Sequence, residues 1–358
     1  MSLRFHWMLP KGGEVAIGRE QTPVEAARYR VGSTNYASPA PRPDFDGWLH
    51  FARHAEAAGI DSVLISFSRY EPDPLVVSCA LGQATETLRF MLAYRSGLMQ
   101  PATFVQQINT LSTLIGGRLS LNIVAGSSSA EQRGYGDFLA HDQRYERADE
   151  FLSVCHRFWR DGEVDFDGSH YRVAQGKLHT PFQGSVSPEI YISGHSGQSE
   201  RLAATHGSCW LRVADTPQKL REPVGRMRAK GLGVCLRACV ICRPTREEAL
   251  EVAQSLIPNG DVGGQGEAVR LKDSSVMHAA ARANGEAWLS PNLWTGLVPY
   301  YGPVWTTLVG TPDDLADALI GYARIGVTEF ILSGWPEVDT IDCFGSEVLP
   351  RVRRQEVH

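Results

Sequence analysis

Short apolar runs alternate with longer amphipathic stretches along most of this chain. The runs have the length and composition of buried strands, whereas the stretches repeat their apolar residues at three- and four-residue steps, as helices do. Strands are predicted at residues 5–9, 62–67, 88–94, 119–125, 189–193, 209–213, 234–242 and 329–332. Helices are predicted at residues 45–58, 73–85, 101–115, 145–159, 198–205, 217–230, 247–256, 312–325 and 339–352. Eight strand–helix pairs in 358 residues indicate an α/β fold, a TIM (β/α)8 barrel rather than an open sheet.

Three segments interrupt this order, and we expect them to be insertions in one TIM-barrel domain over residues 1–358. They lie at about residues 10–43, 161–187 and 258–303. The first and the last are long and rich in Gly or Pro, and loops of that length in a compact domain usually cover a site. The middle insertion contains an expected hairpin, Val164–Val173, with Asp167-Gly168 as its turn.

Composition and charge exclude several classes of partner. With 43% hydrophobic residues the chain can bury a large core, and its net charge of −5 argues against nucleic acids and anionic membranes. No apolar run is long enough to span a bilayer, and the start MSLRFHWMLP lacks the features of a signal peptide. We therefore expect a cytoplasmic protein.

Common metal and nucleophile motifs find little support. Cys239 and Cys242 form a C-x-x-C, but a strand sends these two side chains to opposite faces, so buried thiols are expected. The seven cysteines, an odd number, agree with a reducing compartment. His6 stands alone in its strand, without the spacing of a metal site, and we expect it to face inward near the pocket. No G-x-G-x-x-G follows the first strand and no G-x-S-x-G is present.

The stretch from Leu119 to Phe151 carries the first candidate site. Its strand stops at the small polar turn Gly126–Ser129, whose backbone can approach a ligand closely. His141, Arg144 and Tyr145 then lead into a helix, and the free N–H groups and dipole of a helix start favour an anion such as phosphate. The alternative is a solvated turn with Asp142 as the helix cap, and these residues alone do not separate the two.

A second loop has the same character. Gly194, His195 and Ser196 end the strand 189–193 and open a helix, a geometry in which backbone N–H groups and a serine hydroxyl hold phosphate. A simple N-cap by Ser196 is the alternative.

The order and spacing of several blocks resemble one known family over nearly the whole chain. The blocks are FHWMLPKGG, HAEAAGIDSVLI, QPATFVQQINTLSTLIGGRLSLNIVAGS, HDQRYERADEF, VDFDGSHYRV, YISGHSGQSERLAA, SPNLWTG and FILSGWPE. The chain is similar to the bacterial luciferase-like flavin monooxygenases, most of all to the branch with alkanesulfonate and dimethylsulfone monooxygenases.

This resemblance implies a cofactor and a partner. The family binds FMN, whose phosphate would lie at Ser196, His141 and Tyr145, within the loop that also holds Gly194 and His195. Asn122, Ala125, Gly126 and Ser127 would lie beside the flavin ring. Reduced FMN (FMNH2) and O2 would oxygenate a small-molecule substrate, and a separate NAD(P)H-dependent flavin reductase would supply the FMNH2, since no NAD(P)H site is evident. Residues 258–303 would form the lid that keeps water out.

Several positions depart from the sulfonate-type pattern. Glu71 stands where the resembling enzymes carry a cysteine, Cys239 replaces a histidine, and Trp335 replaces a tyrosine. A lid arginine is replaced by Tyr301 or its neighbour. The resemblance implies that Arg237, Glu71 and Trp335 are the catalytic positions. Arg237 alone of that polar set persists, so we expect it to contact an anionic or strongly polar part of the substrate or of the flavin peroxide, with Glu71 as a candidate ion partner. A purely structural ion pair is the alternative.

The predicted function is thus an FMNH2- and O2-dependent monooxygenase for an organosulfur, sulfonate-like or other small organic compound. A deazaflavin (F420)-dependent oxidoreductase and a non-catalytic flavin-binding protein are the alternatives. A homodimer or homotetramer is expected. An apolar stripe on the helix 101–115, formed by Phe104, Ile108, Leu111 and Leu114, is either shared between subunits or buried against its own barrel.

Overall fold

The structure is a computed structural model, and it describes residues 2–10, 45–68, 71–126, 128–257, 287–298, 303–334 and 337–356. Most of the insertions 10–43 and 258–303 lies outside these ranges. The central strands are β1 (Arg4–Met8), β2 (Ser62–Ile65), β3 (Arg89–Tyr94), β4 (Leu119–Ile123), β7 (Glu189–Ser193), β8 (Cys209–Val213), β9 (Gly233–Cys242) and β12 (Glu329–Gly334). All eight coincide with a predicted strand, with ends that differ by at most two residues.

The pairing of these strands gives the fold class. They follow one another as β1-β2-β3-β4-β7-β8, β8 also pairs with β9, and β9 pairs with β12, which pairs with β1. The pairs that join β12 to β1 and β9, and β4 to β3 and β7, are parallel. Circular order in a parallel ladder defines the predicted TIM (β/α)8 barrel.

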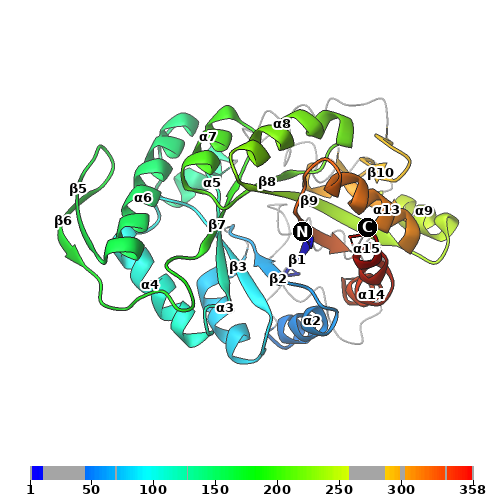
Figure 1. Ribbon diagram of the computed structural model, residues 1–358, viewed down its shortest axis with the longest axis horizontal. Coiled ribbons are helices and arrows are strands. Elements are labelled where there is room, and N and C mark those ends of the chain that lie inside the picture. Colours follow the sequence, from blue (N-terminus) through cyan, green and yellow to red (C-terminus); the bar gives the residue numbers. More distant parts are fainter. Residues whose placement is uncertain are drawn as a thin grey trace. The chain divides into compact units, whose positions relative to one another are not determined.

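Helices follow most of the strands, as Figure 1 shows. They are α2 (Phe45–Ala57), α3 (Pro74–Gln83), α4 (Pro101–Leu114), α5 (Ser129–Gly134), α6 (His141–Asp161), α7 (Gly197–His206), α8 (Pro217–Ala229), α9 (Arg246–Ser255), α13 (Pro312–Ala323), α14 (Glu337–Cys343) and α15 (Leu349–Glu356). A π-helical turn, Phe344–Val348, joins the last two, where one continuous helix was predicted. A short pair, β10 (Leu293–Trp294) and β11 (Thr307–Gly310), adds to β9.

The chain divides into two compact units, one formed by residues 1–63 and 212–358 and the other by residues 64–211. The single domain expected over the whole chain stays a prediction. In the first unit Phe5 stacks on Phe330 with ring centroids 5.7 Å apart, and Phe344 packs edge-on against Phe5 at 5.2 Å. Burial of these aromatic side chains stabilises the packing of the C-terminal helical segment against β1 and β12.

His6 lies in a buried polar network of this first unit. Its Nε2 is 2.9 Å from Glu329 Oε2 and its Nδ1 is 2.7 Å from Ser62 Oγ, while Arg4 donates to Glu329 Oε1 over 2.6 Å. Glu329 is the first residue of β12, and the N-terminal ends of barrel strands support stability rather than chemistry. His6 is buried as predicted, and its expected place near the pocket stays a prediction.

In the second unit, α4 packs its apolar stripe against its own core. Phe104, Ile108 and Leu111 are at most 2% exposed, and Phe104 stacks on Tyr94 at 4.1 Å. Only Leu114 is exposed, at 51%. The stripe is thus explained by packing within the unit, and the expected oligomer stays a prediction without support from it.

Two predicted boundaries differ from the observed ones. Helix α6 begins at His141, four residues early, because Gln143 Oε1 accepts from the N–H of the N-cap residue Ala140 over 3.0 Å. In the hairpin of β5 (Glu163–Asp167) and β6 (Arg172–Lys177), Asp167 pairs with Arg172. The connection is therefore residues 168–171, and Asp167 belongs to the strand rather than to the turn.

Candidate active site

The ends of β4 and β7 lie next to each other, as the two candidate loops require. Asn122 pairs with Tyr191 and Ile123 with Ile192. The Ser193 hydroxyl donates to Asn122 Oδ1 over 2.6 Å, and Asn122 is only 4% exposed. The two loops that follow these strands therefore start from neighbouring, side-chain-linked positions.

Arg144 organises the loop that follows β4. The side chain is 1% exposed, and its Nε donates to Ala125 O over 2.9 Å, its Nη2 to Gly126 O over 3.3 Å and its Nη1 to Leu139 O over 2.9 Å. A guanidinium that already serves three carbonyl oxygens is a positioning group, so its interpretation as a phosphate ligand is wrong. Ser127, predicted to lie beside the flavin ring, lies outside the described residues.

Tyr145 and Gly194 meet at the centre of the candidate phosphate site. Tyr145 reaches this point from α6, its hydroxyl forms hydrogen bonds with Ser196 and Ser199, and burial raises its pKa. Gly194 has a φ of 146°, and a Cβ added to it would lie 2.7 Å from Ser199 Cβ and 3.0 Å from Tyr145 Oη. The loop therefore requires glycine, and it holds a protonated phenol against the start of α7.

Ser196 is also the N-cap of α7. Its Oγ accepts from the Ser199 N–H over 3.2 Å, and Ser199 Oγ donates to Ser196 O over 2.8 Å. The alternative prediction, that Ser196 caps the helix, is therefore confirmed. It is compatible with an oxyanion site, because one hydroxyl can accept from a backbone N–H and donate to a ligand. His195, between these residues, is half-buried.

The starts of α6 and α7 are tied together, and both helices lie side by side in Figure 1. Gln198 Nε2 donates to Asp142 Oδ1 over 3.0 Å. Asp142 is thus a link between helices within the first turn of α6, not its cap. His141 is 47% exposed, its ring lies 5.2 Å from that of Tyr145, and its Nδ1 is 3.1 Å from Asp142 Oδ1.

These groups suit an oxyanion. Hydrogen-bond donors come from two helix starts, from the hydroxyls of Tyr145 and Ser196 and from the imidazole of His141. Asp142 adds one negative charge, which would repel an oxyanion. The structure brings together the predicted residues Asn122, Ala125, His141, Tyr145, Gly194, His195 and Ser196 in the second unit.

Arg237 lies in the first unit, at the centre of β9. Its Nη2 donates to Ser333 Oγ over 2.7 Å and contacts Met8 Sδ at 3.6 Å, and its Nη1 donates to the carbonyls of Ala238 and Ile331. Burial lowers its pKa. Within the described part of its own unit no carboxylate pairs with it, so its cationic side chain is solvated by neutral oxygens.

The other two predicted catalytic positions are less defined. Glu71 follows β2 in the second unit, where it is half-buried in a turn closed by its N–H and Ser68 O at 3.0 Å. Its pairing with Arg237 stays a prediction. Trp335, Tyr300 and Tyr301 lie outside the described residues. Cys239, which the resemblance aligns with a histidine, is 6% exposed, and its Sγ lies 3.3 Å from Ser333 Oγ.

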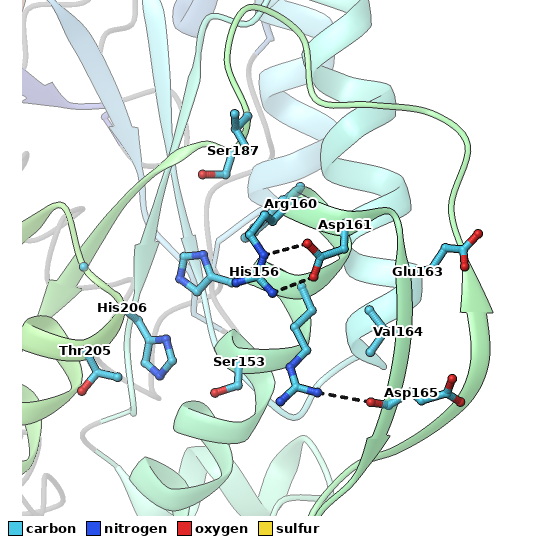
Figure 2. A pocket seen from close by; sticks show the side chains of 14 residues that line it. Ser153, His156, Arg160, Asp161, Glu163, Val164, Asp165, Ser187, Thr205 and His206 are labelled. Atoms are coloured by element: carbon cyan, nitrogen blue, oxygen red, sulfur yellow. Dashed lines mark hydrogen bonds and ion pairs between the residues drawn. The ribbon is translucent and has the colours of Figure 1, made fainter.

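A cavity of about 760 Å³ lies in the second unit at the far end of α6, between β5 and the end of α7 (Figure 2). His156 and His206 stack there with ring centroids 5.4 Å apart. Arg160 pairs with Asp161 at 2.6 Å, and Arg157 donates to Asp165 O over 3.2 Å. Its wall contains none of the predicted site residues, so the cavity and the candidate site are distinct.

A largely buried ion pair at a strand end was not predicted from the sequence. Arg95 directly follows β3, and its Nη2 lies 2.9 Å from Glu131 Oε2 on α5. The available signal was a charged residue directly after an apolar strand, in the position where barrel enzymes place functional groups.

A parallel barrel with helix starts and hydroxyl groups gathered beyond neighbouring strands is typical of enzymes that bind a phosphorylated cofactor. The family model described as luciferase-like monooxygenase matches residues 4–329, so the chain belongs to this family of oxidoreductases. Among the described helices, none is both long and apolar enough to cross a membrane.

Solved structures agree on the fold. EDTA monooxygenase (EmoA) from Chelativorans sp. BNC1 has a TM-score of 0.78 at 20% identity, covering 100% of this chain and 95% of its own. Riboflavin lyase (RcaE), with modified FMN and riboflavin, has a TM-score of 0.74 at 20% identity, covering 100% and 92%. An F420-dependent secondary alcohol dehydrogenase, with an F420–acetone adduct, has a TM-score of 0.67 at 18% identity, covering 99% and 100%.

Proposed function

We propose that this protein is an FMNH2- and O2-dependent monooxygenase that receives reduced flavin from a separate NAD(P)H-dependent reductase. The observation that supports this most is the oxyanion site of Tyr145, Gly194 and Ser196, within a chain of the luciferase-like monooxygenase family. A riboflavin lyase of the same fold contains modified FMN, which makes FMN the first cofactor to test.

The residues fit a phosphate-bearing flavin. Tyr145, Ser196 and His141 would donate to the FMN phosphate, and the α6 and α7 starts would offset its charge. Asn122, held by Ser193, and the backbone of Ala125 and Gly126, held by Arg144, would border the ring system. When bound in its reduced form, FMN would supply the chemistry that activates O2.

The substrate is proposed to be an organosulfur or sulfonate-like compound, or another small organic molecule. Arg237 supports a polar or anionic substrate group, because it is a buried cation without a described carboxylate partner in its own unit. Glu71 and Trp335 are proposed to replace sulfonate-type residues and thereby to change the substrate preference. Replacing Arg237 by Met should raise the substrate KM and leave FMN binding unchanged.

Binding assays with a matched control test the cofactor site. The pair Tyr145→Phe and Ser196→Ala should weaken FMN binding, followed by flavin fluorescence, about tenfold or more. The control pair is Tyr322→Phe and Thr216→Ala, which removes a buried tyrosine hydroxyl bonded to Asp215 O and an N-cap of α8. Equal FMN affinity in both double variants would place the phosphate elsewhere.

An oxygenation assay tests the reaction. A generic flavin reductase with NADPH, FMN and ¹⁸O2 is combined with sulfonates, sulfones and thio-organic compounds, and label in the product is followed by mass spectrometry. An F420-dependent oxidoreductase is the second candidate, because an F420-dependent dehydrogenase shares the fold. Tight F420 binding with hydride transfer and no oxygenation would favour it, and flavin binding without turnover would indicate a binding protein.

We also propose that the protein is a homodimer or homotetramer and that it is located in the cytoplasm. Light scattering tests the oligomeric state, and cell fractionation tests the location.

A further inference from the structure

We propose that Arg95 binds an oxygen atom of the ligand, either a carbonyl oxygen of the bound flavin ring or an anionic oxygen of the substrate. This inference rests on the proposed function, and it adds a contact residue at the end of β3. All the groups that carry it belong to the second unit.

Arg95 is a buried cation with an aromatic cover. Its side chain is 8% exposed, and its guanidinium carbon lies 5.1 Å from the centre of the Phe67 ring and 6.0 Å from that of Tyr135. Its Nη2 donates to Glu131 Oε2 over 2.9 Å and to Phe67 O over 3.4 Å. The charge is thus balanced by one carboxylate and stabilised by two ring faces.

Two of the three guanidinium nitrogens have no acceptor among the residues that the structure describes. Nε and Nη1 are fully buried, and no residue in the described part of the chain accepts a hydrogen bond from them. Buried N–H groups of a cation are rarely left unsatisfied, because the loss of hydration is then not offset. An acceptor that binds Nε–H and Nη1–H side by side would complete the guanidinium.

Two other arginines of this unit, the buried Arg144 and the half-buried Arg118, differ from Arg95. Each nitrogen of Arg144 donates to a carbonyl, and both Nη atoms of Arg118 donate to Thr85 and to the carbonyls of Gly82 and Leu88. Every nitrogen of Arg144 and both Nη atoms of Arg118 thus have an acceptor within the unit. Arg95 is held in place by the fold but keeps donors for another molecule.

A neighbouring amide shows the same property. Gln132 follows Glu131, is 1% exposed, and its Nε2 also has no acceptor among the described residues. A Cβ on Gly126 would lie 1.6 Å from this Nε2, so the amide covers the loop that we propose to border the flavin ring. Both sets of donors belong to the segments at the C-terminal ends of β3 and β4, the face that barrel enzymes use for chemistry.

The test compares Arg95→Met and Arg95→Lys with Arg118→Met as the matched control. Lysine keeps the charge next to Glu131 but lacks the paired Nε–H and Nη1–H groups. Measured are FMN affinity by fluorescence, the midpoint potential of bound FMN, and the affinity for octanesulfonate from its perturbation of the flavin absorbance. Urea unfolding of each variant shows what is due to stability alone.

The two sources of the acceptor give different results. If a flavin carbonyl is bound, both Arg95 variants weaken FMN binding about tenfold or more, and Arg95→Met lowers the midpoint potential because the cation favours the anionic reduced ring. If a substrate oxygen is bound, FMN affinity is kept and octanesulfonate affinity falls about tenfold. Arg118→Met should lower stability and leave both affinities unchanged.

The inference is overturned if both Arg95 variants bind FMN and octanesulfonate as the parent does, since water then satisfies the donors. It is also overturned if Arg95 and Arg118 variants lose affinity only in proportion to stability. A parent that binds no FMN would refute the proposed function instead. In that case the inference is tested by the shift in Tm that octanesulfonate causes. A shift in the parent that Arg95→Met abolishes supports the inference. No shift in either protein overturns it.

Discussion

The hydroxyl of Ser193 donates to Asn122 Oδ1 over 2.6 Å, which joins the ends of β7 and β4 by a side-chain hydrogen bond. Replacing Ser193 by Ala leaves a buried amide oxygen without this donor and should lower the free energy of unfolding by about 1–3 kcal/mol. Urea unfolding measures this, with Ser185→Ala, an exposed serine, as the control. A loss no larger than that of the control would mean that water replaces the hydroxyl.

Gly194→Ala should weaken FMN binding and destabilise the protein by more than backbone strain alone. The added Cβ would collide with Ser199 and Tyr145, and a φ of 146° is unfavourable for any residue but glycine. Gly184→Ala is the control, because Gly184 also has a positive φ, of 86°, but no atom of the described residues, apart from its chain neighbours, lies within 4 Å of its added Cβ. We expect about 1 kcal/mol from strain in the control, without a change in FMN affinity. Equal effects in the two variants would contradict the collision.

The Asp137 carboxylate should raise the free energy of unfolding at neutral pH, and this contribution should be lost at acidic pH. Burial raises the pKa of its carboxyl, but hydrogen bonds from Arg147 and from the Leu139 N–H outweigh this and lower the pKa below its usual value. A lowered folded-state pKa means that the contribution is present above the ordinary pKa of about 4 and is lost as pH falls through the folded value. Asp137→Asn should therefore cost about 1–3 kcal/mol at pH 7 and progressively less below about pH 4.

Urea unfolding between pH 3 and 7 follows this difference. Asp167→Asn, an exposed carboxylate at 81% paired with Arg172, is the control, and it should show little change at any pH. A constant difference between parent and Asp137→Asn over the whole range would show that the carboxyl does not titrate differently in the folded state.

The thiols of Cys242 and Cys343 lie 3.8 Å apart. A hydrogen bond with Cys242 lowers the pKa of Cys343 to about 7, against the opposing effect of burial. Alkylation of Cys343 by iodoacetamide should therefore rise through a midpoint near pH 7, because the thiolate is the reactive form. Cys242→Ala should move that midpoint toward the ordinary value of about 8.5. A Cys79→Ser background removes the other half-buried thiol, and an unchanged midpoint in Cys242→Ala would refute the coupling.

The barrel could be predicted because its signals are local. Each central strand is a short apolar run, such as Leu119–Ile123, bounded by turn residues, and the order of elements then leaves few topologies. The predicted phosphate residues came together because β4 and β7 are neighbours in that topology. Arg144 was misjudged because a polar residue at a helix start has the same sequence signature whether it faces a ligand or the carbonyls of its own chain.

Other relationships have no signature in the sequence. Cys242 and Cys343 are 101 positions apart, and only the packing of α14 near β9 brings the two sulfurs together. Arg95 and Glu131 are 36 positions apart, and a single charge after a strand forms no pattern by itself. The Nε and Nη1 groups of Arg95 are identified as lacking a described acceptor only from the folded structure, because the sequence does not show which groups surround them.

The pairing of β1 with β12 affects the order in which parts of this chain can fold during synthesis. β1 pairs with β12, and Phe5 lies opposite Phe330, so β1 cannot complete its ladder until the ribosome has made β12. The unit of residues 64–211 is continuous, whereas the other needs both ends of the chain. We therefore expect the continuous unit to form first during translation, while the aromatic residues of β1 stay exposed to chaperones until β12 arrives.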